Sequence, residues 1–184
     1  MAQVKMKGGS RLATAAGVIT ALGILTVAVT TQFEGVRLYA YQDVVGVWTA
    51  CQGVTKNIHK GMKFTREACD ILFIEELEKH EAGMRSCLHD PDAVPEKTYV
   101  AFVSFTYNVG TGGFCKSSVA RRWNAGDPVG ACNALLAWNK AGGRVIGGLT
   151  RRRKMERELC FKGLADQQAE QEKIEAFKRL HPPQ

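Results

Sequence analysis

The sequence predicts an α+β fold that is mainly helical, with one small antiparallel sheet near the front. Several segments repeat apolar residues at helical spacing, whereas residues 36–55 alternate and are rich in Val, Tyr, Trp and Thr. The 184 residues contain no internal repeat and no Pro- or Ser-rich linker, and they suffice for one domain or for two lobes that share a core. We expect two lobes joined by a long helix.

The chain begins with a basic stretch. A run of 22 uncharged residues follows, from Leu12 to Phe33. A membrane span needs about 20 apolar residues and a signal-peptide core about 7–15, so the length favours a span. Twelve of the 22 positions are Ala, Gly or Thr, so a bilayer should hold the segment loosely. A cleaved signal peptide and a buried soluble helix remain alternatives, although Val-Thr-Thr and Ala-Val-Thr are poor cleavage sites. Because the positive charges precede the run, we expect the N-terminus inside and the C-terminus outside.

Local patterns predict the elements that follow. The alternating residues 36–55 indicate a β-hairpin that turns near Asp43–Gly46. Residues 65–88 indicate a long helix with Thr65 as its N-cap. Residues 96–110 are apolar on most sides, which is typical of a buried helix, and they end in glycine.

The second half of the chain is predicted to be helical. Residues 111–126 and 127–143 indicate two helices, the second capped by Asp127 with Pro128 at its first position. Residues 150–163 indicate another, capped by Thr150. Residues 164–184 are polar and weakly helical, as expected of a surface tail.

The net charge and the number of cysteines indicate which partners and which cellular compartment to expect. The net charge of +7 favours an anionic partner, such as nucleic acid, anionic lipid or the bacterial cell wall. An even number of cysteines fits disulfides in an oxidising compartment, although buried free thiols are an alternative and six cysteines allow 15 pairings. No cysteine or histidine spacing suggests a metal site. The six are Cys51, Cys69, Cys87, Cys115, Cys132 and Cys160.

Three polar residues follow the uncharged run closely: Glu34, Asp43 and Thr49. Glycoside cleavage needs a protonated carboxyl group that gives its proton to the leaving oxygen and an ionised one on the other face. An apolar helix beside Glu34 would favour its protonated form, whereas a polar turn would keep Asp43 ionised. The threonine hydroxyl could hold the attacking water. On spacing alone, a solvated surface pair is an equal alternative.

The pattern E-x8-D-x5-T within "EGVRLYAYQDVVGVWTACQG" closely resembles the catalytic block of phage lysozymes of glycoside hydrolase family 24. The resemblance continues through "SFTYNVGTGGFCKSS", "GACNALLAWNKAGG" and "GLTRRRKMERELC", up to about residue 163. With the weak membrane segment in front, the subgroup it resembles is that of signal-arrest-release endolysins. The resemblance implies a two-lobed lysozyme fold and muramidase activity without cofactor or metal: hydrolysis, with inversion, of the β-1,4 bond between N-acetylmuramic acid and N-acetylglucosamine in peptidoglycan.

The same resemblance implies roles for individual residues. Glu34 would be the general acid, and Asp43 and Thr49 would orient the water. The residues expected in or near the saccharide cleft are Gly53, Tyr107, Asn108, Ser117 and Asn139. Arg151 resembles the buried partner of the catalytic glutamate, whose ionised form it would favour against desolvation. Arg152 and Arg153 are expected on a solvated basic helix face.

In this fold the catalytic glutamate ends the first helix, so residues 24–33 would serve both as membrane span and as part of the enzyme. We expect a release anchor at residues 1–33, a catalytic domain at 34–163 and a tail at 164–184. Residues 12–33 would hold an inactive monomer in the host inner membrane, facing the periplasm, until release gives a soluble periplasmic enzyme. The subgroup implies that collapse of the membrane potential would favour release.

No cysteine precedes Cys51, so the anchor has no thiol that could activate this chain by disulfide exchange. The expected pairs are Cys87 with Cys115, Cys132 with Cys160, and Cys51 with Cys69. Two rival functions remain, a tethered peptidoglycan-binding protein without catalysis and a nucleic-acid binder. The export anchor argues against nucleic acid as a partner.

Overall fold

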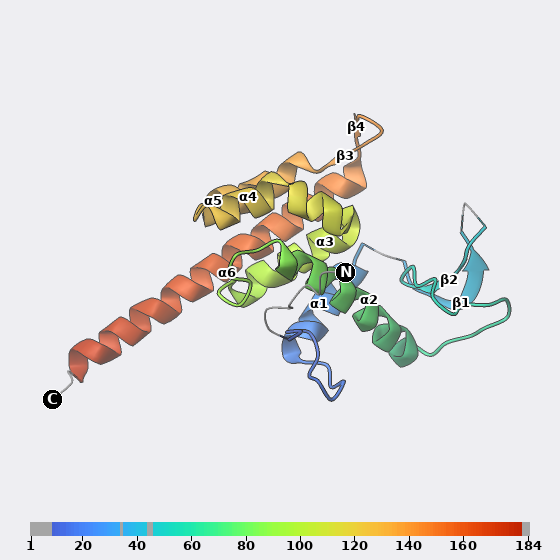
Figure 1. The fold of residues 1–184 in the computed structure, drawn as a ribbon, viewed down its shortest axis with the longest axis horizontal. Helices are drawn as coiled ribbons and strands as arrows, with labels where there is room; N and C mark the ends of the chain where they lie inside the picture. Colours follow the sequence, from blue (N-terminus) through green and yellow to red (C-terminus); the bar gives the residue numbers. More distant parts are fainter. Residues whose placement is uncertain (1–8, 34, 44–45, 182–184) are drawn as a thin grey trace, which may run out of the picture.

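The computed structural model describes residues 9–33, 35–43 and 46–181 of the chain. The molecule is mainly helical, with a two-stranded antiparallel sheet set to one side (Figure 1), as the sequence predicts. The predicted helix over residues 127–143 is wrong in its second half, because the α-helix there ends at Ala134 and a second hairpin, with strands of two residues each, begins at Lys140. The elements in chain order are α1 (Ala21–Thr31), β1 (Arg37–Gln42), β2 (Trp48–Cys51), α2 (Arg66–Ser86), α3 (Glu96–Lys116), α4 (Ser118–Asn124), α5 (Pro128–Ala134), the 3-10 turn η1 (Leu135–Ala137), β3 (Lys140–Ala141), β4 (Arg144–Val145) and α6 (Gly147–Leu180).

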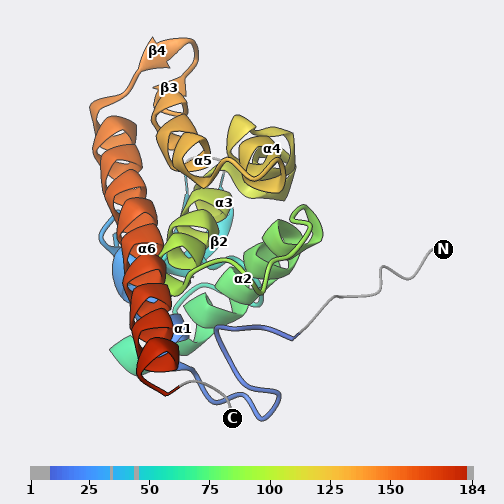
Figure 2. The ribbon, with the colours of Figure 1, turned by 90° about the vertical axis from the view of Figure 1, so that its left-hand side faces the viewer.

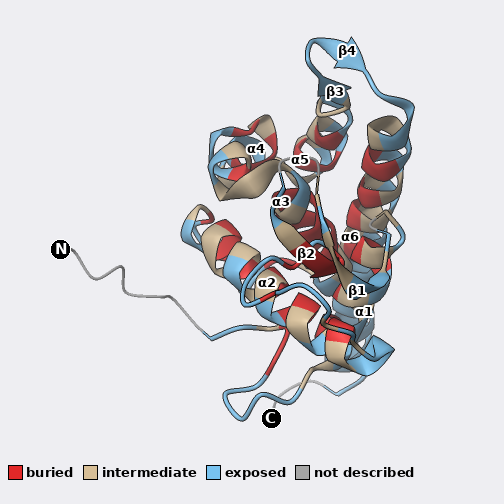
Figure 3. Cartoon of the chain, turned by 90° about the vertical axis from the view of Figure 1, so that its right-hand side faces the viewer, coloured by how far each residue is buried: buried red, intermediate tan, exposed pale blue. Residues whose placement is uncertain are grey.

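Two apolar clusters give the molecule its two lobes. The larger surrounds α3, whose Phe102 and Phe105 are fully buried, and it includes side chains of α1, α2, α5 and α6. Figure 3 shows the buried residues concentrated on α3 and on the inward faces of its neighbours. The smaller cluster lies under the β1–β2 sheet and contains Ala50, Cys51 and Cys69. Helix α2 contributes to both clusters, so it is the long helix that joins the lobes.

The uncharged run is not one continuous helix here. Thr20 caps α1, its hydroxyl accepting a hydrogen bond from the Gly23 N–H at 3.0 Å. The preceding residues form turns closed by a β-bridge between Ala13 and Ile19, and Leu12 is fully buried. Among the residues described, no helix combines the length and the apolar character that crossing a membrane requires. The membrane span stays a prediction.

The predicted hairpin is confirmed. Strands β1 and β2 pair antiparallel, with Tyr41 opposite Thr49, and the chain turns between Asp43 and Gly46. Gly46 has a φ of 82°, a conformation that glycine adopts without steric cost. Two predicted caps are also confirmed, because Thr65 accepts a hydrogen bond from Ala68 N–H and Asp127 accepts one from Gly130 N–H.

The C-terminal helix differs from the prediction at both ends. It begins at Gly147, and Thr150 lies inside it, donating its hydroxyl proton to the Ile146 carbonyl, so Thr150 is not the cap. It then runs past residues 163 and 164 without a break to Leu180. Residues 165–180, which lie in the segment predicted to be a weakly helical tail, form an exposed helical arm. Figures 1 and 2 show α6 running along one side of the molecule and projecting beyond the other helices.

All six cysteines are paired, and the expected pairing is confirmed: Cys51 with Cys69, Cys87 with Cys115, and Cys132 with Cys160. The first joins β2 to α2 within the small lobe. The second joins the end of α2 to the end of α3, and the third fastens α5 to α6. Cys132 and Cys160 are fully buried, whereas Cys115 is exposed.

Two of the disulfides form a matched pair for a stability measurement, because each spans 28 residues. Chain entropy alone predicts that losing either costs about 3–4 kcal/mol. Cys132→Ala with Cys160→Ala should cost more than Cys87→Ala with Cys115→Ala, because truncating two buried side chains also leaves a cavity. Denaturant unfolding of both variants checks this, and equal losses would contradict it.

Candidate active site

Glu34, the predicted general acid, lies outside the described residues, and three groups of described residues lie next to it in the chain or carry the other predicted site residues. Phe33, the residue before it, follows the C-terminal end of α1. Asp43 and Thr49 lie on the hairpin that comes next in the chain. A third group of polar side chains comes from α3 and α6.

Asp43 and Thr49 are both held by the main chain of Val47. The Val47 N–H donates to Asp43 Oδ1 at 2.9 Å, and Thr49 Oγ1 donates to the Val47 carbonyl at 3.0 Å. Because the threonine hydroxyl donates its one proton to that carbonyl, it can only accept a hydrogen bond from any further partner. A water that donates to both Thr49 and the Asp43 carboxylate would keep a lone pair for attack. The Val47 main chain thus holds two acceptors of the kind that hydrolysis needs.

Tyr107 ties α3 to the end of β2. Its hydroxyl donates to the Gln52 carbonyl at 2.9 Å, and its ring makes edge contacts with Phe73 and His80. The next residue, Gly53, has a φ of 94°, and a Cβ built there would lie 3.6 Å from the Tyr107 hydroxyl oxygen. The structure therefore brings together two of the predicted cleft residues, Gly53 and Tyr107.

Glu156 is the centre of a buried charged cluster. Its carboxylate lies 3.1 Å from Arg152 Nε and 2.8 Å from Arg153 Nε, and it accepts a hydrogen bond from Ser104 Oγ at 2.8 Å. Arg153 and Glu156 are fully buried, and Arg152 is 3% exposed. Arg153 also donates to Asn108 Oδ1 at 3.0 Å, which joins that predicted cleft residue to the cluster.

The cluster corrects the predicted arginine assignment. Arg151, expected to be buried, is exposed, whereas Arg152 and Arg153, expected in solvent, are buried. Arg152 also stacks over the Phe33 ring, with its guanidinium carbon 5.0 Å from the ring centroid. The sequence carried a signal for this arrangement, because Glu156 follows Arg152 by four residues and Arg153 by three, the two spacings that meet on one helix face.

The cluster keeps a positive charge next to Phe33. Burial lowers the pKa of Arg153 to about 10, so the guanidinium remains protonated at neutral pH. Burial raises the pKa of Glu156, and the two guanidinium groups and the Ser104 hydroxyl oppose that rise. With all three groups ionised, two cations and one anion leave a net charge of +1. A positive charge at this position would stabilise a nearby carboxylate.

The two remaining predicted cleft residues have other partners. Ser117 is 1% exposed; its hydroxyl caps α4 and donates to the Phe114 carbonyl at 2.6 Å. Asn139 follows η1 and donates to Thr150 Oγ1 at 3.3 Å. These contacts hold elements of the large lobe together, so a role in binding saccharide stays a prediction for both.

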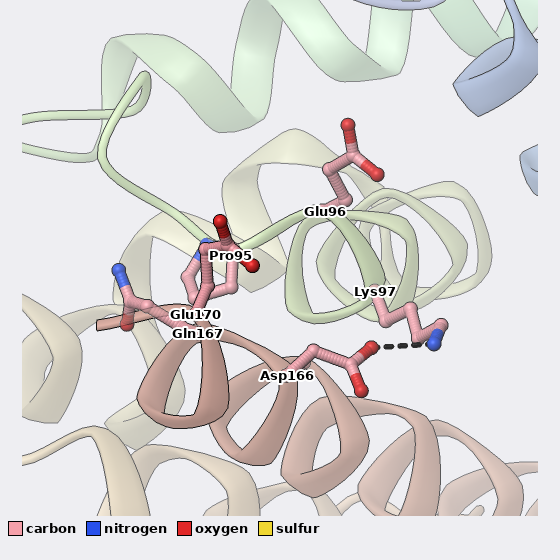
Figure 4. A pocket seen from close by; sticks show the side chains of 7 residues that line it. Pro95, Glu96, Lys97, Asp166, Gln167 and Glu170 are labelled. Carbon is pink, nitrogen blue, oxygen red and sulfur yellow. Dashed lines mark hydrogen bonds and ion pairs between the residues drawn. The ribbon is translucent and has the colours of Figure 1, made fainter. Parts of the chain in front are cut away.

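A surface pocket lies between the start of α3 and the middle of α6 (Figure 4). It is lined by Pro95, Glu96, Lys97, Gly163, Asp166, Gln167 and Glu170. Lys97 and Asp166 form an ion pair across it. None of the predicted site residues lines this pocket.

Comparison with known proteins identifies the class. Residues 31–156 match the family described as Phage lysozyme. The SAR-endolysin of Enterobacteria phage PA-2 is 40% identical over 131 residues, which cover 71% of this chain and 78% of that protein. These matches define a lysozyme-type glycoside hydrolase. The chain belongs to the phage lysozyme family.

Solved structures agree on the fold. A mutant of P22 lysozyme superposes with a TM-score of 0.67 at 28% identity, covering 83% of this chain and 99% of that one. The endolysin from Escherichia coli O157:H7 phage FAHEc1 gives a TM-score of 0.66 at 28% identity, covering 84% of this chain and 95% of that one. The predicted lysozyme fold is confirmed.

Proposed function

We propose that this protein is an endolysin that hydrolyses the β-1,4 bond between N-acetylmuramic acid and N-acetylglucosamine in peptidoglycan, and so lyses the host cell. Family membership supports the reaction class. The observation that carries the mechanism is the shared use of the Val47 main chain, which holds the Asp43 carboxylate before the hairpin turn and the Thr49 hydroxyl on β2 after it. Glu34 precedes this turn at the spacing expected of the general acid.

In the proposed mechanism Glu34 gives its proton to the leaving glycosidic oxygen. Asp43 and Thr49 accept hydrogen bonds from one water, and the ionised Asp43 removes a proton as that water attacks the anomeric carbon from the opposite face. The product then has inverted configuration. The proposed enzyme acts as a monomer and uses no cofactor.

Arg152 is the proposed electrostatic partner of Glu34, in place of Arg151. Two observations support it: its guanidinium stacks over Phe33, the residue before Glu34, and it belongs to a cluster in which two arginines share one glutamate. Glu156 and the Ser104 carbonyl, which accepts from Arg152 Nη2 at 3.1 Å, hold this guanidinium in place.

Residues 12–33 are proposed to tether an inactive form in the inner membrane, with the N-terminus in the cytoplasm. The described fold supports a switch, because Leu12, Leu22 and Val29 are buried in the large core. Side chains cannot lie in lipid and in this core at the same time. The enzyme would therefore assemble only when the segment leaves the bilayer, and would then act in the periplasm.

The rival function is a tethered peptidoglycan-binding protein without catalysis. Glu34→Gln separates the two, because it removes the proton donor while preserving shape. We expect lysis of chloroform-treated Gram-negative cells to fall by at least about 100-fold, and Asp43→Asn to have a similar effect. Asp90→Asn, at an exposed loop residue, is the control and should lyse like wild type. Full activity of Glu34→Gln would exclude the mechanism.

The arginine assignment has a matched test on neighbouring residues. Arg152→Lys keeps the charge but loses the planar fork that contacts Glu156 and the Ser104 carbonyl, so we expect activity to fall about tenfold or more. Arg151→Lys, at an exposed site one residue away, should leave activity unchanged. Activity measured on equal amounts of folded protein checks this. The opposite ranking would restore Arg151 as the partner.

The proposed switch is tested by the muralytic activity of one chain in two states. We expect the chain in isolated inner membranes to be inactive and the same chain, once released, to be active. Glu34→Gln in both states corrects for activity from other enzymes. Equal activity of wild type in both states would mean that the segment only tethers a finished lysozyme.

A further inference from the structure

Glu81 is a second buried carboxylate that the proposed mechanism does not use. It lies on α2, is 1% exposed, and belongs to the large lobe. A buried ionised carboxylate is costly unless hydrogen bonds or opposite charges compensate it. The groups that compensate the Glu81 carboxylate therefore matter for its stability, and they come from two parts of the chain.

Two of those groups come from the N-terminal segment. Ser10 Oγ donates to Glu81 Oε2 at 2.6 Å, and the Arg11 main-chain N–H donates to Oε1 at 2.7 Å. The Arg11 guanidinium donates to the Val94 carbonyl at 2.9 Å and stacks over the Tyr99 ring at 4.3 Å. Ser10 and Arg11 thus bind the helical body through side-chain and main-chain atoms.

The body supplies the other half of the site. The Tyr99 hydroxyl, on α3, donates to Glu81 Oε1, and Arg85 Nη1 donates to the Tyr99 oxygen at 3.1 Å. Burial and the Glu81 charge raise the pKa of Tyr99, so it keeps the proton that it donates. Arg85 in turn pairs with Asp92 at 2.8 Å. The partners in these contacts all lie outside residues 9–12.

Residues 10–12 are also joined to the start of α1. The Thr20 hydroxyl, which caps α1, lies 2.7 Å from the Arg11 carbonyl and 3.0 Å from the Leu12 carbonyl, with which it makes hydrogen bonds. Thr20 N–H donates to the Leu12 carbonyl at 2.9 Å. Leu12 itself is fully buried. Binding at Glu81 therefore holds the beginning of α1 on the body.

In the tethered state these partners would be apart. Ser10 and Arg11 precede the uncharged run, so they would lie on the cytoplasmic side, while Glu81 lies in the periplasmic domain. About 20 helical residues span about 30 Å of hydrocarbon, far beyond hydrogen-bond distance. Partial withdrawal of the run would not bring them together.

We propose that Glu81 is the docking site for Ser10 and Arg11, and that it captures the N-terminal segment only when residues 12–33 have left the bilayer completely. This inference rests on the proposed membrane tether. Its consequence is that Glu81 opposes reinsertion and holds the enzyme in the released form. Residues outside the uncharged run therefore contribute to the switch.

A double-mutant cycle on the full-length chain tests the docking site. Inner-membrane vesicles carrying wild type, Ser10→Ala, Glu81→Gln or the double variant are treated with an uncoupler, and the ratio of released to bound chain is measured at equilibrium. Thr14→Ala is the matched control, because Thr14 is exposed, lies near Ser10 in the chain, and its hydroxyl oxygen accepts a local hydrogen bond from the Val18 N–H at 3.1 Å.

We expect Ser10→Ala and Glu81→Gln each to lower the released-to-bound ratio about tenfold or more, the size expected for a lost hydrogen bond to a charged group. The double variant should resemble Glu81→Gln alone, because the two residues share one contact. Thr14→Ala should behave as wild type. If Glu81→Gln does not fold, Ser10→Ala against Thr14→Ala decides.

Two results would overturn the inference, and they are distinguishable. A Ser10→Ala ratio equal to that of Thr14→Ala, or effects of the two substitutions that multiply, would remove the docking role while wild type still shows activity only after release. Wild type that is fully active while membrane-bound would remove the tethered off-state itself, and the docking role with it.

Discussion

The ion pairs of Glu156 with Arg152 and Arg153 are the contact on which the active-site half of the molecule depends. Three ionisable side chains are buried there, and such a cluster is tolerated only with good geometry and added hydrogen bonds. Ser104 and Asn108 each supply one such bond from α3, so the cluster fixes α6 against α3. Phe33 stacks on the same cluster, which links the end of α1 to both helices.

The hairpin half of the site depends on local contacts. Asp43, Val47 and Thr49 lie within seven residues, so their hydrogen bonds join groups that are close in the sequence. Its position on the body depends on the Tyr107 hydroxyl bond to Gln52 and on the Cys51–Cys69 disulfide. Phe33, the residue before the proposed acid, therefore packs on the large lobe, whereas the groups that would hold the water belong to the hairpin of the small lobe.

This division explains what the sequence could predict. Alternation, turn residues and caps are properties of neighbouring residues, so the hairpin and the caps at Thr65 and Asp127 were correctly predicted. The buried arginines were not, because their assignment depends on where α6 begins and which face meets α3. The N-cap was expected at Thr150, whereas it is Ile146, four residues earlier. Residues 164–180 lack a buried face, yet they are helical because a helix already formed extends at little cost.

The composition of the uncharged run has a reason in the folded enzyme as well as in the proposed tether. A Cβ at Gly23 would lie 2.2 Å from the Leu12 carbonyl oxygen, so only glycine permits that close approach. Thr26 and Thr30 are fully buried, and the Thr26 hydroxyl is satisfied within α1 by the Leu22 carbonyl at 2.8 Å. A leucine-rich span would anchor more firmly in lipid, but its larger side chains would not fit at these positions. The packing of the uncharged run into the large lobe therefore requires small residues. The same small residues would make the hold of this run on a membrane weak.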